Sequence, residues 1–520
     1  MMKHLEFSSS SLPSIDITST WHKPKPKQEI ATQTRAQKYV ESDTQTSASI
    51  HQAVQTDLDS NDLKRSAALK LDAKQQAALV AFLDTAERDV SRQLLQNLSS
   101  RAYDGFDVKW EDDVDTNSKL YQLQDPYVEE KLIVTCLAWS ASGRTVAAAF
   151  GRRDHAAWCT HSGRVSTWSL SGKVVTDKPT FSAQVSTCLM SLIYHPVQNT
   201  VIAGGSYHGQ IMIWDTNKNE NPVIATTGDG ELAHHEAVSS ISWVPSSSGQ
   251  HVYDILTTST EGKILIYSFS NDLSLPIIGS RITLSNVARV VRPPLNSKVA
   301  KNVFPVGITA GSLPQAVGSY VDHLIVGTET GFVLKCNTSG TRIGDPSEKS
   351  EDLMNPVIFG FASHTGPIHS IACAPFHRNL FLTCGDDCEV RVYNALQPNP
   401  ILVLEPSSMS LTCAAWSPTR PALYAVGCAD GNVYFYDLRT STTSPAYTLS
   451  MNTSSTSSSF VKRGITSLAF SKRPNKPGHH LTDDFFATAD DAGLVHIYRL
   501  STDFSREVIG EMWTLDNISN

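Results

Sequence analysis

A short segment that recurs seven times constrains the fold of this chain more than any other feature. In its full form the segment is a glycine, then alternating apolar residues, then an aromatic residue five places after the glycine. The full form occurs five times, as GRVSTW (163–168), GQIMIW (209–214), GKILIY (262–267), GNVYFY (431–436) and GLVHIY (493–498). Two variant copies carry a cysteine at the last or the first position, GFVLKC (331–336) and CEVRVY (388–393). Glycine permits a tight turn and period-two alternation gives a strand one core-facing side, so each copy predicts a β-strand after a turn.

Two further β-rich runs precede each copy. The first run is VTCLAWS (134–140), STCLMSLIYHP (186–196), VSSISWVP (238–245), PIHSIACAP (367–375), LTCAAWSP (411–418) and ITSLAFS (465–471), with VGITA (306–310) as a weaker copy. The second run is rich in small residues, as in VAAAF (146–150), and we expect it to lie at a crowded central axis. The units end at residues 168, 214, 267, 336, 393, 436 and 498, so they are 43 to 69 residues apart. A unit of about 40–50 residues with loop insertions has the period of a four-stranded propeller blade.

These repeats resemble the WD40 family over residues 131–520. The resemblance implies an all-β fold, a seven-bladed WD40 β-propeller. Trp214-Asp215 is the only literal Trp-Asp dipeptide of the chain. On the WD40 pattern, His364 and Asp387 would form a structural pair within one blade.

The segments before the repeats differ in composition from the rest of the chain. Residues 1–62 are predicted to be a disordered tail, because residues 1–60 hold 17 Ser or Thr and six Gln but few large apolar side chains. Residues 63–100 are predicted to hold one amphipathic helix with Ser66 as a candidate cap, and residues 101–130 a connector that docks on the propeller. The helix prediction rests on apolar residues that recur every three or four places, namely Leu79, Phe82 or Leu83, Ala86, Val90 and Leu94. This helix either packs on the propeller or on a copy of itself, or it enters a groove of a dimeric partner, which we favour.

A Gln-Thr pair occurs three times in the tail, in ATQT (31–34), DTQT (43–46) and AVQTD (53–57). An extended segment of this kind can add a strand to the sheet edge of another protein. The segments resemble the recognition motif of the eight-kilodalton dynein light chain; the alternative is a chance recurrence in a polar linker. The resemblance implies light-chain contacts at Thr32, Gln33, Thr34, Thr44, Gln45, Thr46, Val54, Gln55 and Thr56.

Composition and motifs exclude several classes of protein. A net charge of −8 argues against nucleic acid as the main partner, and no apolar stretch is long enough for membrane insertion. Residues 1–30 show no secretory signal, so the nine cysteines are interpreted as reduced thiols of a cytosolic protein. No phosphate-binding, nucleophile-elbow or zinc-protease motif occurs, so we expect no enzyme activity, no catalytic residues and no cofactor.

Two groups of residues have alternative interpretations. Cys384 and Cys388, with His369 or His377, are the best metal candidates, but these cysteines stand where other repeats have small or turn residues. Packing is therefore preferred and no metal site is predicted. The insertion GRRDHAAWCTHSG (151–163), with His155, Trp158 and His161, is either a partner-contacting loop or a solvated one.

Light-chain motifs, an amphipathic helix and a WD40 ring together resemble the dynein intermediate chain family. AGGSYHGQIMIWD (203–215) is similar to the second-blade signature of this family, and SHTGPIHSIACAPFHRNLFLTCGDD (363–387) to the fifth. AYDGFDVKW (102–110), GRRDHAAW (151–158) and GTETGFVLKC (327–336) are similar to the WD-repeat protein 34 branch, which serves cytoplasmic dynein-2. The resemblance implies a non-catalytic subunit for retrograde intraflagellar transport and cilium assembly. It would be found in the cytoplasm, on the cytoskeleton and in the cilium, at the axoneme and basal body.

The same resemblance implies four partners. The propeller would bind the dynein-2 heavy chain, a second intermediate chain of the WD-repeat protein 60 type would complete the pair, and the Gln-Thr segments would bind the eight-kilodalton light chain. A roadblock-type light chain would bind the helix through Leu79, Phe82, Leu83, Ala86, Val90 and Leu94. Two alternatives remain, an intermediate chain of an axonemal or general cytoplasmic dynein, and a propeller with a ligand site in its central channel.

Overall fold

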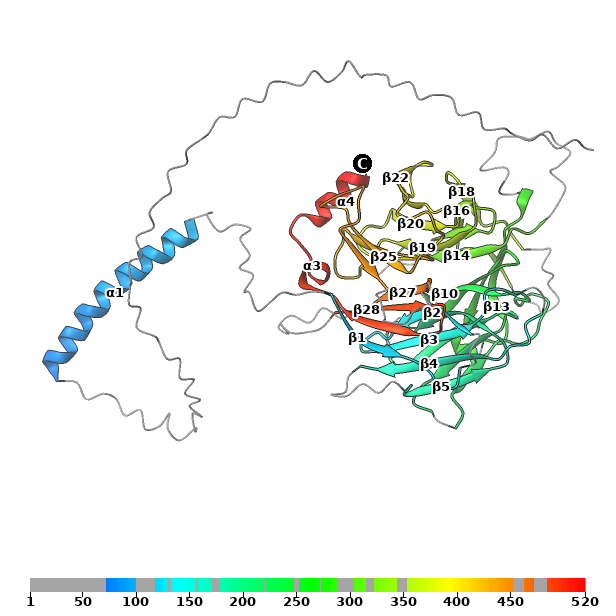
Figure 1. Ribbon diagram of the computed structural model, residues 1–520, viewed down its shortest axis with the longest axis horizontal. Helices are drawn as coiled ribbons and strands as arrows, with labels where there is room; N and C mark the ends of the chain where they lie inside the picture. The colour runs from blue at the N-terminus through cyan, green and yellow to red at the C-terminus, as the bar shows by residue number, and fades with distance from the viewer. Residues whose placement is uncertain are drawn as a thin grey trace, which may run out of the picture. The chain divides into compact units, whose positions relative to one another are not determined.

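The computed structural model divides the chain into two units, residues 1–107 and 108–520 (Figure 1). Within these units the described residues are 72–99, 117–128, 132–155, 158–170, 178–218, 220–246, 252–271, 273–285, 287, 304–314, 322–343, 353–451, 463–471 and 484–519. The predicted disordered tail and its Gln-Thr segments lie outside the described residues.

The second unit is a seven-bladed β-propeller, which confirms the predicted fold (Figure 1). Blade 1 contains β2 (Ile133–Trp139), β3 (Thr145–Gly151), β4 (Gly163–Ser169) and β5 (Phe181–Val185); blade 2 contains β6 (Leu189–Tyr194), β7 (Val201–Ser206), β8 (Ile211–Asp215) and β9 (Val223–Thr226). Blade 3 contains β10 (Val238–Pro245), β11 (Tyr253–Ser259), β12 (Lys263–Ser268), β13 (Pro276–Arg281) and the short β17 (Thr341–Arg342). Blade 4 contains β14 (Ile308–Ser312), β15 (His323–Thr328), β16 (Val333–Asn337) and β18 (Val357–Gly360); blade 5 contains β19 (Ile368–Cys373), β20 (Leu380–Gly385), β21 (Val390–Asn394) and β22 (Pro400–Leu404). Blade 6 contains β23 (Leu411–Trp416), β24 (Leu423–Cys428), β25 (Asn432–Asp437) and β26 (Tyr447–Ser450).

Blade 7 is assembled from both ends of the ring. β27 (Ile465–Phe470), β28 (Phe485–Asp490) and β29 (Val495–Arg499) are completed by β1 (Ser118–Leu123), which pairs antiparallel with β29. The segment predicted as a connector over 101–130 therefore supplies the outer strand of a blade, and the propeller begins before residue 131. Pairing the first strand with the last sheet joins the two ends of the ring by backbone hydrogen bonds.

The recurring glycine lies where the chain turns into the third strand of a blade. The residue at this turn has a positive φ in six blades, Gly209 (+86°), Gly262 (+80°), Gly331 (+85°), Gly431 (+87°), Gly493 (+77°) and Cys388 (+65°). Glycine adopts this conformation freely, whereas other L-residues rarely do. The backbone geometry thus explains why glycine recurs at the start of the repeated segment. Cys388 adopts the same positive-φ conformation although it is not a glycine.

The inner strands are β2, β6, β10, β14, β19, β23 and β27, each contacting the inner strands of its two neighbours. The small-residue strands are the second strands of the blades, so the expectation that they lie at the axis is wrong. Their small side chains are needed because both faces are covered: a Cβ added at Gly205 in β7 would lie 2.5 Å from Val238 of blade 3. Buried apolar side chains of the described residues form seven clusters, one at each blade-to-blade interface.

The described helices are α1 (Ala73–Ser99), η1 (Phe269–Asn271), α3 (Thr502–Ser505) and α4 (Glu511–Ser519). No described helix is long and apolar enough to cross a membrane. After blade 7 the chain returns to blades 5 and 6, where Leu515 of α4 is fully buried in the cluster between them. The Arg420 guanidinium pairs there with Glu511 of α4 and, at 2.9 Å, with Asp437 of β25.

Candidate functional site

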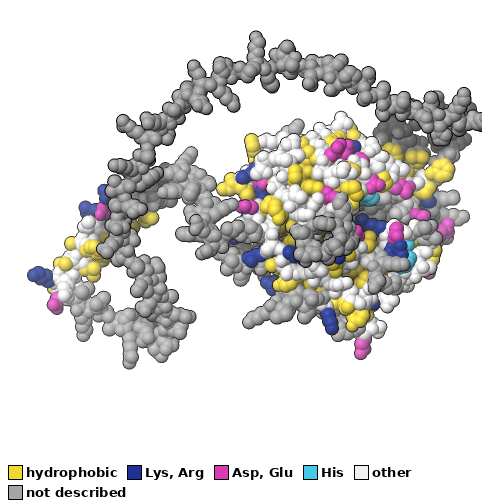
Figure 2. All heavy atoms as spheres, in the orientation of Figure 1, with side chains coloured by type: hydrophobic (Ala, Val, Ile, Leu, Met, Phe, Trp, Pro, Cys, Tyr) yellow, Lys and Arg dark blue, Asp and Glu magenta, His cyan; other side chains and the backbone are white. Residues whose placement is uncertain are grey.

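Helix α1 carries the apolar residues that the sequence assigned to a light chain, and they are exposed. Exposed fractions are 43% for Leu79, 66% for Phe82, 53% for Leu83, 56% for Val90 and 57% for Leu94, while Ala86 is half-buried. Val80 and Leu95 are also exposed, which widens the apolar surface beyond one stripe. Figure 2 shows hydrophobic side chains on the surface of this helix. Exposed apolar surface of this extent is typical of a site that a partner covers.

Asp72 directly precedes the first residue of α1. The first helical hydrogen bond runs from Gln76 N–H to Asp72 O at 2.9 Å, and the Gln75 side chain accepts a hydrogen bond from Asp72 N–H at 3.1 Å. The side-chain bond from Gln75 is one half of a capping box, with Asp72 at the N-cap position. The described helix begins at Ala73, and the predicted cap Ser66 lies outside the described residues.

Blade 5 holds the histidine–acid pair that the WD40 pattern implies. His364 Nδ1 lies 3.0 and 2.9 Å from the two carboxylate oxygens of Asp387, and its Nε2 lies 2.6 Å from Thr383 Oγ1. Burial lowers the pKa of His364, although the hydrogen bond to Asp387 opposes this effect. The neutral imidazole links the entry to β19, strand β20 and the turn before β21.

Blade 3 holds a second pair of this kind that the sequence reasoning missed. His234 Nδ1 lies 3.3 Å from Glu261 Oε1, and its Nε2 lies 2.8 Å from Thr257 Oγ1. Burial would raise the pKa of Glu261, but the His234 hydrogen bond and the Lys263 ammonium lower it to about 2. The sequence signal that could have identified this pair is the position of the acid before the turn residue. Glu261 directly precedes Gly262, as Asp387 directly precedes Cys388.

The described part of the chain does not gather the metal candidates from the sequence into a metal-binding group. Cys384 is buried in β20, and burial raises the pKa of its thiol well above the usual range. Cys388 occupies the positive-φ turn and His369 pairs with Asp386 at 3.3 Å. The packing interpretation of these cysteines agrees with their positions in the blade.

The insertion between β3 and β4 lies against blade 2. The Trp158 ring, 73% exposed, stacks on His208 with ring centroids 3.8 Å apart, and the His155 ring stacks on Tyr207 at 3.9 Å. Burial, with the nearby His161, lowers the pKa of His155. The loop is thus held on the neighbouring blade by ring contacts.

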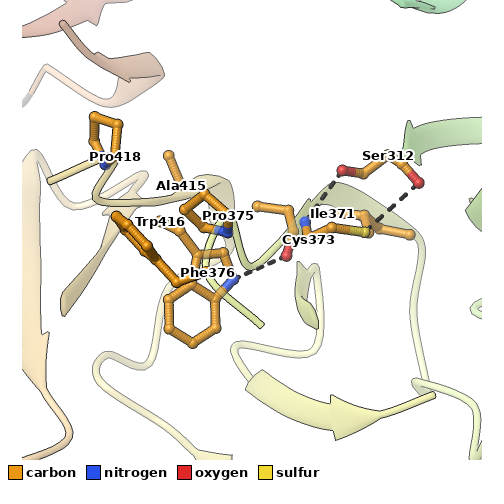
Figure 3. Close-up of a pocket in the computed structure, with 9 residues that line it drawn as sticks. Ser312, Ile371, Cys373, Pro375, Phe376, Ala415, Trp416 and Pro418 are labelled. Carbon is orange, nitrogen blue, oxygen red and sulfur yellow. Dashed lines mark hydrogen bonds between the residues drawn. The ribbon is translucent and has the colours of Figure 1, made fainter. Parts of the chain in front are cut away.

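A cavity of about 380 Å³ lies between blades 4, 5 and 6 (Figure 3). Its lining is mainly apolar and includes Ile371, Phe376 and Trp416, and no residue that lines it is charged. Cys373 is its one thiol, and burial raises its pKa to about 12, so the thiolate is disfavoured. This cavity lacks the acid–base groups that catalysis needs.

Comparison with known proteins identifies the family. A family profile described as "Dynein axonemal intermediate chain 3 WD40 domain" matches residues 308–500. The chain is 33% identical to "Cytoplasmic dynein 2 intermediate chain 2" of Mus musculus over 85% of its own length and 79% of the relative, and 32% identical to the Homo sapiens protein over 84% and 78%. It is 27% identical to "Dynein axonemal intermediate chain 2" of Rattus norvegicus over 52% of its length and 39% of that relative.

The chain belongs to the dynein intermediate chain family. Members of this family are generally non-catalytic scaffold proteins. Within the described residues, the exposed apolar face of α1 is the candidate for a binding surface.

Proposed function

We propose that this chain is the non-catalytic intermediate chain of a cytoplasmic dynein-2 motor for retrograde intraflagellar transport and cilium assembly. The observation that carries the proposal is the extent of similarity: 33% identity spans 85% of the chain for a dynein-2 relative, against 27% over 52% for an axonemal one. The site of action would be the cytoplasm, the cytoskeleton and the cilium, including the axoneme and basal body.

Each partner is assigned to one part of the chain. The propeller would bind the dynein-2 heavy chain, and α1 would bind a roadblock-type light chain through its exposed apolar face. The Gln-Thr segments at 32–34, 44–46 and 54–56 would bind the eight-kilodalton light chain. Three weak sites on one tail gain apparent affinity through effective concentration. A second intermediate chain of the WD-repeat protein 60 type would complete the complex.

An axonemal or general cytoplasmic dynein is the second candidate. The match of residues 308–500 to an axonemal intermediate chain profile favours it. Intermediate chains of these different dyneins share the propeller. The part of the chain before and within blade 1 therefore distinguishes one kind of dynein intermediate chain from another better than the later blades do.

Affinity purification with the full chain as bait from ciliated cells of its own source, followed by mass spectrometry, tests the assignment. Recovery of the dynein-2 heavy chain with both light-chain types is the expected result. Recovery of an axonemal or general cytoplasmic heavy chain would instead support the second candidate. Light chains without any heavy chain would contradict the motor assignment.

A tail variant tests the light-chain sites separately. Alanine at Gln33, Thr34, Gln45, Thr46, Gln55 and Thr56 should abolish binding of the eight-kilodalton light chain. The control replaces neighbouring Ser47, Ser49 and Ser60, which keeps the tail length and changes no Gln-Thr pair. Unchanged binding in the first variant would refute the tail sites.

A further inference from the structure

Two histidines and two cysteines meet beside the insertion loop of blade 1. His155, Cys159 and His161 lie in the loop between β3 and β4, and Cys188 immediately precedes β6 of blade 2. One ligand-capable atom of each residue lies within 4.8 Å of those of the other three. Cys159 and Cys188 are 3% and 0% exposed, while the two histidines are half-buried.

Buried ring nitrogens without hydrogen bonds point to a missing ligand. Both ring nitrogens of His155 and Nδ1 of His161 are buried and have no hydrogen-bond partner in the described structure. Buried polar side-chain atoms are nearly always hydrogen-bonded, and leaving one unpartnered destabilises the folded state. A cation bound among these atoms would take their lone pairs and remove that penalty.

The loop is anchored on the segment that carries Cys188. The Gly163 N–H donates to Thr187 O at 3.1 Å, and a Cβ added at Gly163 would lie 2.2 Å from the same oxygen. At the other end of the loop, a Cβ added at Gly151 would lie 2.9 Å from Cys188 Cβ. Both ends of the loop therefore pack against residues 187–189, which brings the loop ligands close to Cys188.

The donor atoms select the kind of ion. Two sulfurs and two imidazole nitrogens suit Zn²⁺, whereas Ca²⁺ and Mg²⁺ take oxygen ligands. Two thiolates also neutralise the double charge of the ion, and each thiol releases its proton on binding. With bonds of about 2.0–2.3 Å, a tetrahedral zinc ion places its ligand atoms about 3.3–3.8 Å apart. Atoms already within 4.8 Å need only small side-chain rotations to reach this geometry.

We propose that His155, Cys159, His161 and Cys188 bind one structural zinc ion that fastens the blade 1 insertion to blade 2. All four ligands come from protein, as in closed structural sites, so the ion has no open position for substrate. It holds the loop in the place where Trp158 stacks on His208 and presents a 73% exposed indole. The ion thereby fixes the position of the exposed Trp158 indole on the propeller, which the pairing of the strands does not determine.

Metal analysis of the purified full chain is the first test. After gel filtration in reducing buffer, we expect about one equivalent of zinc per chain. The Cys159→Ser/Cys188→Ser variant should lose nearly all of it. Cys388→Gly, which removes a thiol outside the cluster and restores the turn residue of the other blades, should keep it. His208→Ala, which removes the neighbouring ring but no proposed ligand, should also keep it.

A second measurement uses only the unmodified chain and remains decisive where the double variant fails to fold. Cobalt(II) added to the zinc-depleted chain should give thiolate-to-cobalt charge-transfer absorption and the intense visible bands of tetrahedral sites. The proposal is overturned by a folded chain without stoichiometric zinc, by full zinc content in the double variant, or by copper or iron in its place. A Cys159–Cys188 disulfide recovered under reducing conditions would overturn it as well.

Discussion

Helix α4 buries Leu515 in the propeller, whereas the large apolar side chains of α1 are exposed. α4 has nine residues, fewer than the about 12–15 that an isolated helix needs, yet Leu515 is fully buried and Glu511 is paired with Arg420. α1 has 27 residues, and Phe82 and Leu94 remain 66% and 57% exposed. The propeller thus supplies the packing that makes a short helix possible. The long helix leaves its apolar face exposed.

The largest effect on propeller stability is expected from Arg420→Ala. The guanidinium is 2% exposed and bridges Asp437 and Glu511, so its removal leaves two carboxylates buried without their partner. Breaking such a buried pair costs about 3–5 kcal/mol, measured as the free energy of unfolding in denaturant. Arg92→Ala on α1 is the control, because its ion pair with Asp89 is exposed and its loss should cost below about 0.5 kcal/mol. Equal losses in both variants would remove the distinction between the helices.

A pair of leucine replacements compares the two apolar faces directly. Leu515→Ala should destabilise the propeller by about 2–5 kcal/mol, because a cavity forms between blades 5 and 6. Leu94→Ala should leave the stability of the propeller unchanged within about 0.5 kcal/mol, since the side chain is 57% exposed. The measurement is thermal unfolding of the full chain at equal concentration. A large loss for Leu94→Ala would indicate that α1 packs within the chain.

The pH dependence of stability should come from the ring through Glu261. Its pKa is lowered to about 2, so the folded state releases this proton more readily than the unfolded state. The contribution is fully present above about pH 4.5 and is lost as the pH falls towards 2, and it amounts to about 3 kcal/mol. Glu261→Gln should flatten the acid limb of the stability profile, measured by denaturant titration at each pH. Glu87→Gln on α1 is the control, and a profile unaltered by Glu261→Gln would contradict the role of the His234–Glu261 pair.

Repeated local features could be predicted from the sequence because each depends on a few neighbouring residues. Glycine permits the positive φ of the turn and the strand residues alternate, so the seven copies predicted seven blades. The small-residue run was recognised in the sequence, but it was predicted at the central axis, one strand inward of its actual position. Composition shows that a strand is crowded but does not show which other strands surround it. The pair of His234 with Glu261 was not predicted, since a glutamate stands in blade 3 where blade 5 has Asp387.

Long-range pairings could not be predicted in the same way. β1 belongs to none of the seven repeat units in the sequence. Its pairing could not be predicted because its partner, β29, lies more than 370 residues away along the chain. The last helix, α4, depends on Arg420 and the apolar cluster of blades 5 and 6, neither of which is near it in sequence. Two strands, β4 and β5, lie between the loop histidines and Cys188 in the sequence, so only the fold brings the four candidate zinc ligands together.

The smallest effect on the propeller, and the sharpest on α1, is expected from Val90→Pro. A proline inside a helix removes a hydrogen bond and clashes with the preceding turn, at about 3 kcal/mol or more, so α1 should break near its middle. The unfolding midpoint of the propeller should not change, while binding of a roadblock-type light chain, measured by calorimetry with the full chain, should be lost. Ala73→Pro is the matched control, because the first helical position tolerates proline and should preserve binding. If Val90→Pro still bound the light chain with unchanged affinity, the exposed face of α1 would serve some other contact, and the contrast with α4 would concern packing alone.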